Sequence, residues 1–476
     1  MAEYDIKNFA GGINESVDTS LIASNEAEYA RNCDMKNGSL KPQKGLLKME
    51  GIAECPVNIT TLMMYYNGIE KHYVAAGEGK LYLFNGTEWI LLGTGYGSDK
   101  WDFINYKLNN EDVMILVNGI NNNKILKGVE LRNMKDRRVS YDDLGAINGY
   151  YDANGVLRAT EDLVTTLAPV AKFVELHFER VWLGGDKSIY FSKDFDPEDF
   201  TIPVTELEAN QHGGEIVMES FDATKIVGLK VIFNDIVIFK EKSIFKIVGA
   251  YAEQYEKIQL FGSNGAIADG SIISTPRGAY FLHTDGIYVY DGVNCAVISD
   301  KLTKTIAELD KVEIVNARAS EHRGHYLIGV KHITNWITID FDYENNTFMV
   351  YTIPIKGFLN VVHDLYATLG DKYIYEYAKG LYLPLEWHTG IVTADVPQAI
   401  KECEDIYFTG KGQNITVTLR TEKKDKTKVI TLNDNLKVTK KTLINYGRLI
   451  QFLFSTVATE YTEIIGFKAI MDTDFD

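Results

Sequence analysis

The chain has 476 residues, of which 45% are hydrophobic and 24% are charged, and its formal net charge is −17. This composition is typical of an ordinary globular protein, and the length is enough for about three domains of roughly 150 residues each. The acidic excess argues against a broad nucleic-acid-gripping surface, which needs basic patches. Because no run of about 18 apolar residues is present, we expect no membrane-spanning helix. The start of the sequence predicts no signal peptide.

The residue types favour an all-β protein. The chain has only 9 prolines but 39 glycines, 28 tyrosines and 22 phenylalanines, which is typical of sheets joined by tight turns. The four cysteines lie far apart and form no CxxC pair, which argues against a disulfide scaffold and a structural zinc site.

Residues 1–50 differ from the rest of the chain, because they are polar, rich in Gly and Asn, and without a hairpin pattern. We interpret them as an extended N-terminal arm. Within the arm, Ser24–Asn32 (SNEAEYARN) begins with a favourable N-cap residue and continues with Glu and Ala, so it predicts a short helix.

Residues 51–390 contain a weak internal repeat. In each unit an apolar run reaches a turn, and a second run with alternating Tyr or Phe comes after it. The units start about 49 residues apart on average, which is the length of one four-stranded propeller blade. They are His72–Phe84, Val113–Leu126, Val181–Ser192, Asp235–Val248, Ala279–Tyr290, Tyr326–Phe341 and Leu365–Tyr377.

The repeat therefore predicts an irregular β-propeller of about six to eight blades. Each hairpin alternates apolar and polar residues, and radial stacking buries both faces of a sheet against its neighbours. A stack of separate β-sandwiches is the alternative. Within this region, Asp300–Leu309 (DKLTKTIAEL) predicts a short helix with an Asp N-cap.

Residues 391–476 predict a small antiparallel β-sandwich. Asn414–Arg420, Lys428–Leu432 and Leu449–Phe454 alternate cleanly, and Ile464–Met471 is apolar almost throughout. The charged run Glu422–Lys428 (EKKDKTK) predicts a sheet edge protected against pairing with other edges.

No catalytic motif stands out, since the chain has no GxxxxGK[ST], GxSxG or HExxH. His322, His325 and His332 could ligate zinc if the fold brought them together, but the sequence around them predicts a turn that enters a strand, without a partner Cys or carboxylate at a ligand spacing. The acidic run Asp194–Phe200 is interpreted as a solvated loop between blades, with both of its phenylalanines tucked in. The run Asp340–Asn346 is interpreted as a strand end that continues into an Asn-Asn turn, and calcium binding is the alternative for both runs. We assign no catalytic, cofactor or metal residue.

A series of short motifs opens the chain. These are Phe9–Asn14 (FAGGIN), Asn25–Ala27 (NEA), Arg31–Asp34 (RNCD) and Gly38–Gly45 (GSLKPQKG). Further matches occur at Val181–Gly185 (VWLGG), Ile189–Ser192 (IYFS), Asp196–Phe200 (DPEDF) and Gly278–Tyr288 (GAYFLHTDGIY). Their order resembles the tail proteins of tailed bacteriophages, a family similar to the packaged-DNA stabilisation protein and tail nozzle.

The resemblance implies a non-enzymatic structural virion protein. Such proteins are β-propellers that form a homo-oligomeric ring, expected to be a hexamer, in the neck or tail. The ring extends the DNA channel, retains packaged DNA and anchors fibres or spikes. Its expected partners are the portal, the adaptor or other tail proteins, and genomic DNA passes without sequence-specific binding. Assembly is expected in the host bacterial cytoplasm.

We expect the arm to dock on a neighbouring subunit or adaptor, because a polar arm with spaced apolar anchors gains order from a partner. Two alternatives to the ring stay open: a tail-tip or fibre-associated propeller that binds a host glycan, and a carbohydrate-active propeller enzyme. The candidate docking residues are Phe9, Gly11, Gly12, Ile13, Asn14, Leu21, Ile22 and Tyr29.

Overall fold

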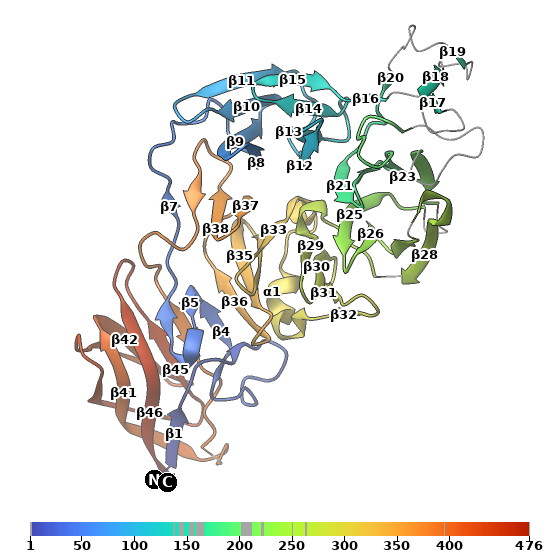
Figure 1. The fold of residues 1–476 in the computed structure, drawn as a ribbon. Helices are drawn as coiled ribbons and strands as arrows, with labels where there is room; N and C mark the ends of the chain where they lie inside the picture. The colour runs from blue at the N-terminus through green and yellow to red at the C-terminus, as the bar shows by residue number, and fades with distance from the viewer. Residues whose placement is uncertain are drawn as a thin grey trace.

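The computed structural model describes residues 2–136, 139–141, 147–151, 157–158, 166–200, 212–219, 223–249, 251–261, 264–394 and 396–475. A propeller domain and a sandwich domain lie side by side, and both chain termini lie at the far end of the sandwich (Figure 1). Strands dominate the described residues, and none of the helices there has the length and apolar character needed to span a membrane.

Seven four-stranded antiparallel sheets form the propeller within the described residues, in agreement with the predicted fold class. In the first six blades the strands pair in chain order. The first three blades comprise β8 (Thr61–Asn67), β9 (Glu70–Gly77), β10 (Lys80–Phe84), β11 (Trp89–Thr94); β12 (Asp102–Leu108), β13 (Glu111–Val117), β14 (Lys124–Lys127), β15 (Glu130–Asn133); β21 (Phe173–His177), β22 (Arg180–Gly184), β23 (Ser188–Phe191) and β24 (Gly214–Val217).

The next three blades have the same pattern, and short strands lie between the second and third blades (Figure 1). These blades comprise β25 (Ile226–Ile232), β26 (Asp235–Lys240), β27 (Ile244–Val248), β28 (Glu256–Phe261); β29 (Ile273–Thr275), β30 (Gly278–His283), β31 (Gly286–Tyr290), β32 (Cys295–Val297); β33 (Arg318–His322), β34 (His325–His332), β35 (Asn335–Asp342) and β36 (Thr347–Tyr351). The short strands are β16 (Lys135–Asp136), β17 (Val139–Tyr141), β18 (Ile147–Tyr151), β19 (Leu157–Arg158) and β20 (Thr166–Leu167).

The seventh blade closes the ring with a strand from the other end of the domain. It contains β37 (Gly357–Val361), β38 (Asp364–Thr368) and β39 (Tyr375–Glu376), and its fourth strand is β7 (Leu47–Lys48). The register pairs Tyr375 with Lys48 and Glu376 with Leu47. The strand β7, which precedes the first blade in the sequence, therefore completes the seventh blade.

Each predicted hairpin forms the second and third strands of one blade, from β9–β10 to β38–β39. The alternation of residues along the strands reflects burial of each strand face against a different neighbouring blade. In β10, Leu81 and Leu83 face a buried cluster shared with the second blade, whereas Tyr82 and Phe84 face one shared with the seventh. Both faces of the strand are buried, each against a different neighbour.

The sandwich consists of two antiparallel sheets, one of four strands and one of five. Phe467 lies between them, with its ring centroid 4.9 Å from those of Phe408, Phe452 and Phe454. The sheets have the orders β1-β46-β41-β44 and β4-β40-β45-β42-β43. The strands are β1 (Ala2–Ile6), β4 (Tyr29–Arg31), β40 (Glu386–His388), β41 (Ile400–Gly412), β42 (Asn414–Thr421), β43 (Asp425–Thr431), β44 (Lys437–Gly447), β45 (Ile450–Ser455) and β46 (Thr462–Phe475).

The predictions of short helices had different outcomes. The helix predicted for Asp300–Leu309 is confirmed, since η5 (Ser299–Leu302) leads into α1 (Thr303–Ala307). The predicted Asp N-cap is wrong, because Asp300 lies inside η5 and its side chain caps neither helix. The prediction of a helix for Ser24–Asn32 is wrong, because β3 (Glu26–Ala27) and β4 replace the helix, and β4 pairs with β40. Sheet pairing outweighs the weak helix propensity of a few residues. The remaining short elements are β2 (Gly12–Ile13), β5 (Cys33–Asp34), β6 (Lys41–Pro42), η1 (Lys36–Gly38), η3 (Ala252–Gln254), η4 (Asp269–Ser271) and η6 (Glu313–Asn316).

Candidate functional site: two oppositely charged surfaces

The expected docking arm lies against the chain's own domains. Phe9 and Ile13 are fully buried, and the Phe9 ring meets the Trp387 ring edge-on at 5.5 Å. Gly12 has a φ of 72°, and a Cβ there would lie 3.0 Å from the Phe348 carbonyl oxygen in blade six. A Cβ at Gly11 would lie 2.5 Å from the backbone of Asn25. The FAGGIN motif therefore fits against blade six and the sandwich at once.

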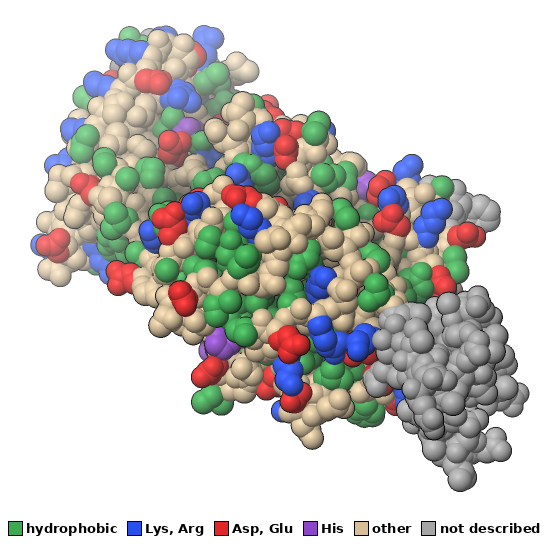
Figure 2. Space-filling view, turned by 90° about the horizontal axis from the view of Figure 1, so that it is seen from above, with side chains coloured by type: hydrophobic (Ala, Val, Ile, Leu, Met, Phe, Trp, Pro, Cys, Tyr) green, Lys and Arg blue, Asp and Glu red, His purple; other side chains and the backbone are tan. Residues whose placement is uncertain are grey.

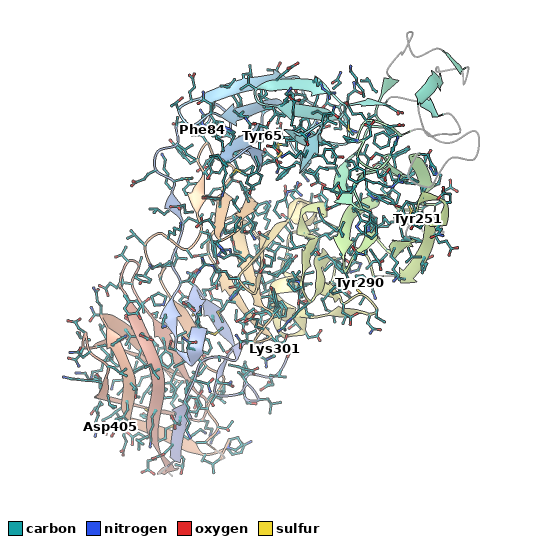
Figure 3. The ribbon with its side chains drawn as sticks, in the orientation of Figure 1. Tyr65, Phe84, Tyr251, Tyr290, Lys301 and Asp405 are labelled. Atoms are coloured by element: carbon teal, nitrogen blue, oxygen red, sulfur yellow. The ribbon has the colours of Figure 1, made fainter. Side chains whose placement is uncertain are left out.

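The polar residues of this segment are also used internally. The Asn14 side-chain amide donates to Glu26 at 2.7 Å, and Lys301 donates to the same carboxylate at 2.7 Å. Burial would raise the pKa of Glu26, but the hydrogen bonds from Lys301 and Asn14 outweigh burial and lower it. Lys301 lies where the sandwich meets the propeller (Figure 3).

Of the eight candidate docking residues, Leu21 has the most exposed side chain, at 73%. Ile22 is half-buried against Gly390. Tyr29 lies under the Arg31 guanidinium at 4.4 Å. In place of a free arm, residues 2–48 tie the two domains together, and Leu21 is the candidate docking residue that this arrangement leaves most accessible to a partner.

A concentration of positive charge marks one side of the sandwich. Residues 411–448 contain ten Lys and Arg against three Asp and Glu, a net charge of +7, so the other residues of this −17 chain together carry −24. The strands β43 and β44 are the edge strands of the two sheets and lie beside each other. We call this surface the basic edge: Lys423, Lys424, Lys426, Lys428, Lys437, Lys440 and Lys441, with the exposed apolar residues Val429, Val438, Ile444 and Tyr446.

Most lysines of the basic edge have no ion-pair partner among the described residues, and Lys426, Lys437 and Lys441 are examples. Lys440 is different, since it lies 2.7 Å from Asp405, whose carboxylate raises the pKa of this lysine. Lys428 donates to the Thr442 carbonyl at 2.8 Å. The edge therefore presents positive charge beside exposed apolar groups.

One face of the propeller has the opposite character. The turns between the first and second and between the third and fourth strands of every blade leave the sheets at the same end. We call this end the tip face. Its exposed apolar residues are Ile69, Val129, Phe178, Phe195, Phe233, Tyr251, Val293 and Val362. Its turns also carry Glu88, Glu111, Glu130, Glu179, Asp194, Glu253, Asp291, Glu344 and Asp364.

Contacts between neighbouring turns support this arrangement. The Phe195 N–H donates to the Glu179 carbonyl at 2.9 Å, which joins the two turns of blade three. A hollow lined by Asn109, Asp112, Glu179 and Phe195 continues from blade two to blade three. The tip turns of blades two and three are therefore continuous. The tip turns of the ring are acidic and apolar overall, although they also carry Lys127, Lys193, Arg277 and Arg323.

Several of the exposed apolar residues in the tip-face turns have a strained backbone conformation. Phe178, Phe233 and Val362 have φ values of 47°, 48° and 58°. The corresponding turn of blade two uses Asn109 and Asn110, which tolerate positive φ far better. The exposed Ile333, in a turn on the opposite face, has a similar φ of 52°, so this conformation is not confined to the tip face. The tip face was not predicted from the sequence.

Blade four of the tip face lies far from the basic edge, whereas the tip turn of blade six, with Glu344 and Asn345, borders residues 34–38 of the N-terminal segment. Tyr251 of the tip face and Asp405, which pairs with Lys440 of the basic edge, are at opposite ends of the molecule (Figure 3). In another view, hydrophobic side chains lie between charged ones over the exposed surface (Figure 2). One copy therefore presents two different, complementary surfaces in different directions.

The weaker metal hypotheses meet competing contacts. His325 Nδ1 lies 2.9 Å from Asp340, and His332 Nε2 lies 3.0 Å from Glu308. Burial would lower the pKa of His325, but Asp340 outweighs burial and raises it to about 9. Among the described residues, no three His, Cys, Asp or Glu side chains lie close enough together to hold a metal ion.

The two acidic runs are structural loops. Glu198 pairs with Arg132 at 2.6 Å and accepts the Lys135 N–H at 2.7 Å. Phe200 is buried as expected, but the prediction that Phe195 is also tucked in is wrong, because 70% of it is exposed. Residues 340–346 form the expected strand end and turn, in which Asp342 accepts the Asn345 N–H at 3.0 Å.

Comparisons with known proteins add no relative in sequence. No protein-family model matches the chain, and no curated protein sequence matches it. Solved structures with a related arrangement include BamB from Moraxella catarrhalis, with 8% identity and a TM-score of 0.38, covering 71% of this chain and 97% of that one. PorZ from Porphyromonas gingivalis has 13% identity and a TM-score of 0.40, covering 82% and 46%.

A computationally designed protein, Ika8, has 9% identity and a TM-score of 0.35, covering 71% of this chain and 100% of its own. At these levels of similarity, the propeller assignment depends on the strand order of this chain, and the likenesses carry no functional argument.

Proposed function

We propose that the chain is a non-enzymatic structural protein of a tailed-bacteriophage virion, which forms a ring in the neck or tail. The ring extends the DNA channel, retains packaged DNA and anchors fibres or spikes. The motif order of the N-terminal region and the propeller-plus-sandwich architecture both support this proposal. The observation that carries it is the separation of charge between the tip face and the basic edge.

A ring requires a head-to-tail contact, in which each copy offers two different surfaces. In our proposal the basic edge of one copy contacts the acidic tip face of the next. Opposite charges steer the two surfaces together, and the exposed apolar residues on both become buried. The remaining acidic surface suits a channel that DNA passes without sticking, since like charges repel the phosphates.

The test is the mass of the purified full-length protein in solution, measured by light scattering with and without a portal–adaptor complex. We expect a monomer that forms a ring on the complex. The double variant Lys437→Glu/Lys441→Glu places acidic residues against an acidic surface and should lower ring formation at least tenfold. The matched control is Lys187→Glu/Lys242→Glu, because these exposed lysines lie in turns on the opposite propeller face.

A ring that forms equally well from both double variants would exclude the basic edge as the contact. A stable monomer that ignores the complex would contradict the ring itself. Glycan binding by that monomer would then favour the receptor-binding propeller.

A further inference from the structure

A small cavity of about 200 Å³ lies on the propeller axis. Its lining includes residues from the first strand of all seven blades, among them Phe103, Phe173, Leu229 and Phe358. The first strands of adjacent blades contact one another around the whole ring. The cavity is therefore the central channel of the propeller, narrowed by side chains.

Three cations meet at the end of this cavity where the first strands begin. Lys100 and Lys172 precede β12 and β21, and Arg318 is the first residue of β33. The single carboxylate among them is Asp269, which lies 2.5 Å from Arg318 Nη1 and 3.4 Å from Lys172 Nζ. These four side chains carry a formal net charge of +2, and the Glu313 carboxylate, which accepts a hydrogen bond from Asn316 Nδ2 at 2.7 Å, lies beyond Lys100.

The charge states are set by the surroundings. Burial would raise the pKa of Asp269, but Arg318, Lys172 and Lys100 outweigh burial and lower it to about 2. Burial lowers the pKa of Lys100, and Arg318 and Lys172 lower it further, whereas Asp269 and Glu313 raise it. Lys100 Nζ donates to the neutral amide oxygen of Asn316 at 2.7 Å and forms no ion pair among the described residues. A half-buried cation thus rests on a neutral partner inside an acidic protein.

Local geometry keeps space for this cluster. A Cβ at position 270 would lie 2.1 Å from Arg318 Nη1, so the guanidinium occupies the volume that any residue other than Gly270 would fill. Deeper in the channel, Lys230 lies 2.6 Å from Glu175, and Asp102 adds a second carboxylate, so the negative charges there outnumber the positive one. Burial would lower the pKa of Lys230, but Asp102 and Glu175 outweigh it and raise the pKa. The excess of positive charge is therefore confined to one end.

We propose that this end of the axial cavity binds a small organic oxyanion, with its carboxylate or phosphate group against Lys100, Lys172 and Arg318. Lysine and arginine form strong charge-assisted hydrogen bonds with such groups. The apolar part of the ligand would lie against the aromatic and aliphatic lining, which is the usual composition of a ligand pocket. This inference does not depend on ring formation.

The experiment is titration calorimetry of the full-length protein with benzoate, phenyl phosphate and benzyl alcohol. The first two probes distinguish a carboxylate from a phosphate, and the third has a similar ring without charge. We expect at least one anion to bind saturably and about tenfold or more tighter than the alcohol, a difference of about 1.4 kcal/mol. Absence of saturable binding below about 10 mM, or equal binding of the alcohol, would overturn the proposal.

Single substitutions test whether Lys100 and Lys172 contribute to anion binding. Lys100→Gln removes the charge but retains a hydrogen-bonding group near Asn316, so we expect it to fold and to bind the anion about tenfold more weakly. Lys172→Gln provides the same test if Lys100→Gln fails to fold, as judged by circular dichroism. The matched control is Lys242→Gln, an exposed lysine outside the cavity. Unchanged anion affinity in the folded cavity variant would also overturn the proposal.

Discussion

The propeller and the sandwich are built from the chain in different ways. Six blades are continuous in sequence, and their strands pair with the strands next to them. The sandwich combines both ends of the chain, since β1 pairs with β46 and β4 pairs with β40. Local pairing gives a repeat that is visible in the sequence, whereas the sandwich depends on contacts between residues hundreds of positions apart. The N-terminal segment contributes to both domains, so the two are joined by more than the linker before β40.

Removing residues 2–48 should give the largest effect. The deletion takes away the closing strand of blade seven, two sandwich strands and the buried side chains of Phe9, Ile13 and Cys33. Each buried apolar side chain is worth about 1.5–3 kcal/mol, so we expect a loss of about 5 kcal/mol or more in unfolding free energy. Differential scanning calorimetry of the purified protein measures it. A truncated protein with unchanged melting would show that the segment is dispensable for the fold and free to serve a partner.

Phe467→Ala tests whether the domains unfold together. The ring lies between the two sandwich sheets, so its removal should cost about 3–5 kcal/mol. If the tie through the N-terminal segment couples the domains, calorimetry shows a single transition at lower temperature. Movement of only one of two separate transitions would show that the domains are independent. The control is Phe195→Ala, whose exposed ring should change stability by less than about 0.5 kcal/mol.

Glu463→Gln tests one contact between the N-terminal segment and the sandwich. Glu463 lies 3.2 Å from Lys41 of the N-terminal segment and 3.1 Å from Lys411 of β41. Burial would raise the pKa of Glu463, but hydrogen bonds from Tyr461, Lys411 and Lys41 outweigh it and lower the pKa to about 2. We expect a cost of about 1 kcal/mol at pH 7, the upper value for a screened ion pair.

The pH dependence of the stability of the same variant shows whether the contribution of Glu463 depends on its charge. A lowered pKa in the folded state adds stability above the unfolded value, near 4.5, and this contribution is lost as the pH falls toward 2. The stability of Glu463→Gln and that of the unmodified chain should therefore converge between these pH values in urea unfolding. A difference that stays constant down to pH 2 would assign the effect to packing rather than charge.

Val362→Asn should give the smallest effect, and a stabilising one. Val362 is exposed and has a φ of 58°, which asparagine tolerates better than a β-branched residue. We expect a gain of about 0.5–1 kcal/mol in unfolding free energy. The same variant should weaken any contact made by the tip face, as light scattering of the ring can show. A destabilised variant would mean that the valine side chain stabilises the monomer.

The sequence alone determined the repeating part of this protein. Period-two alternation and turn residues located all seven hairpins, because each blade buries its two faces against neighbours and forms from adjacent residues. The run Glu422–Lys428 was correctly predicted as a sheet edge, since charge on an edge strand has a local cause.

Only the tertiary structure decided the rest. Leu47–Lys48 is too short to carry a strand pattern, and its pairing with β39 exists because the ring must close. Ser24–Asn32 became extended because β40 lies beside it. Lys100, Lys172, Asp269 and Arg318 stand in separate blades, and their chemistry appears only when the axis brings them together. Local periodicity reports which faces are buried, whereas long-range closure determines which side chains meet.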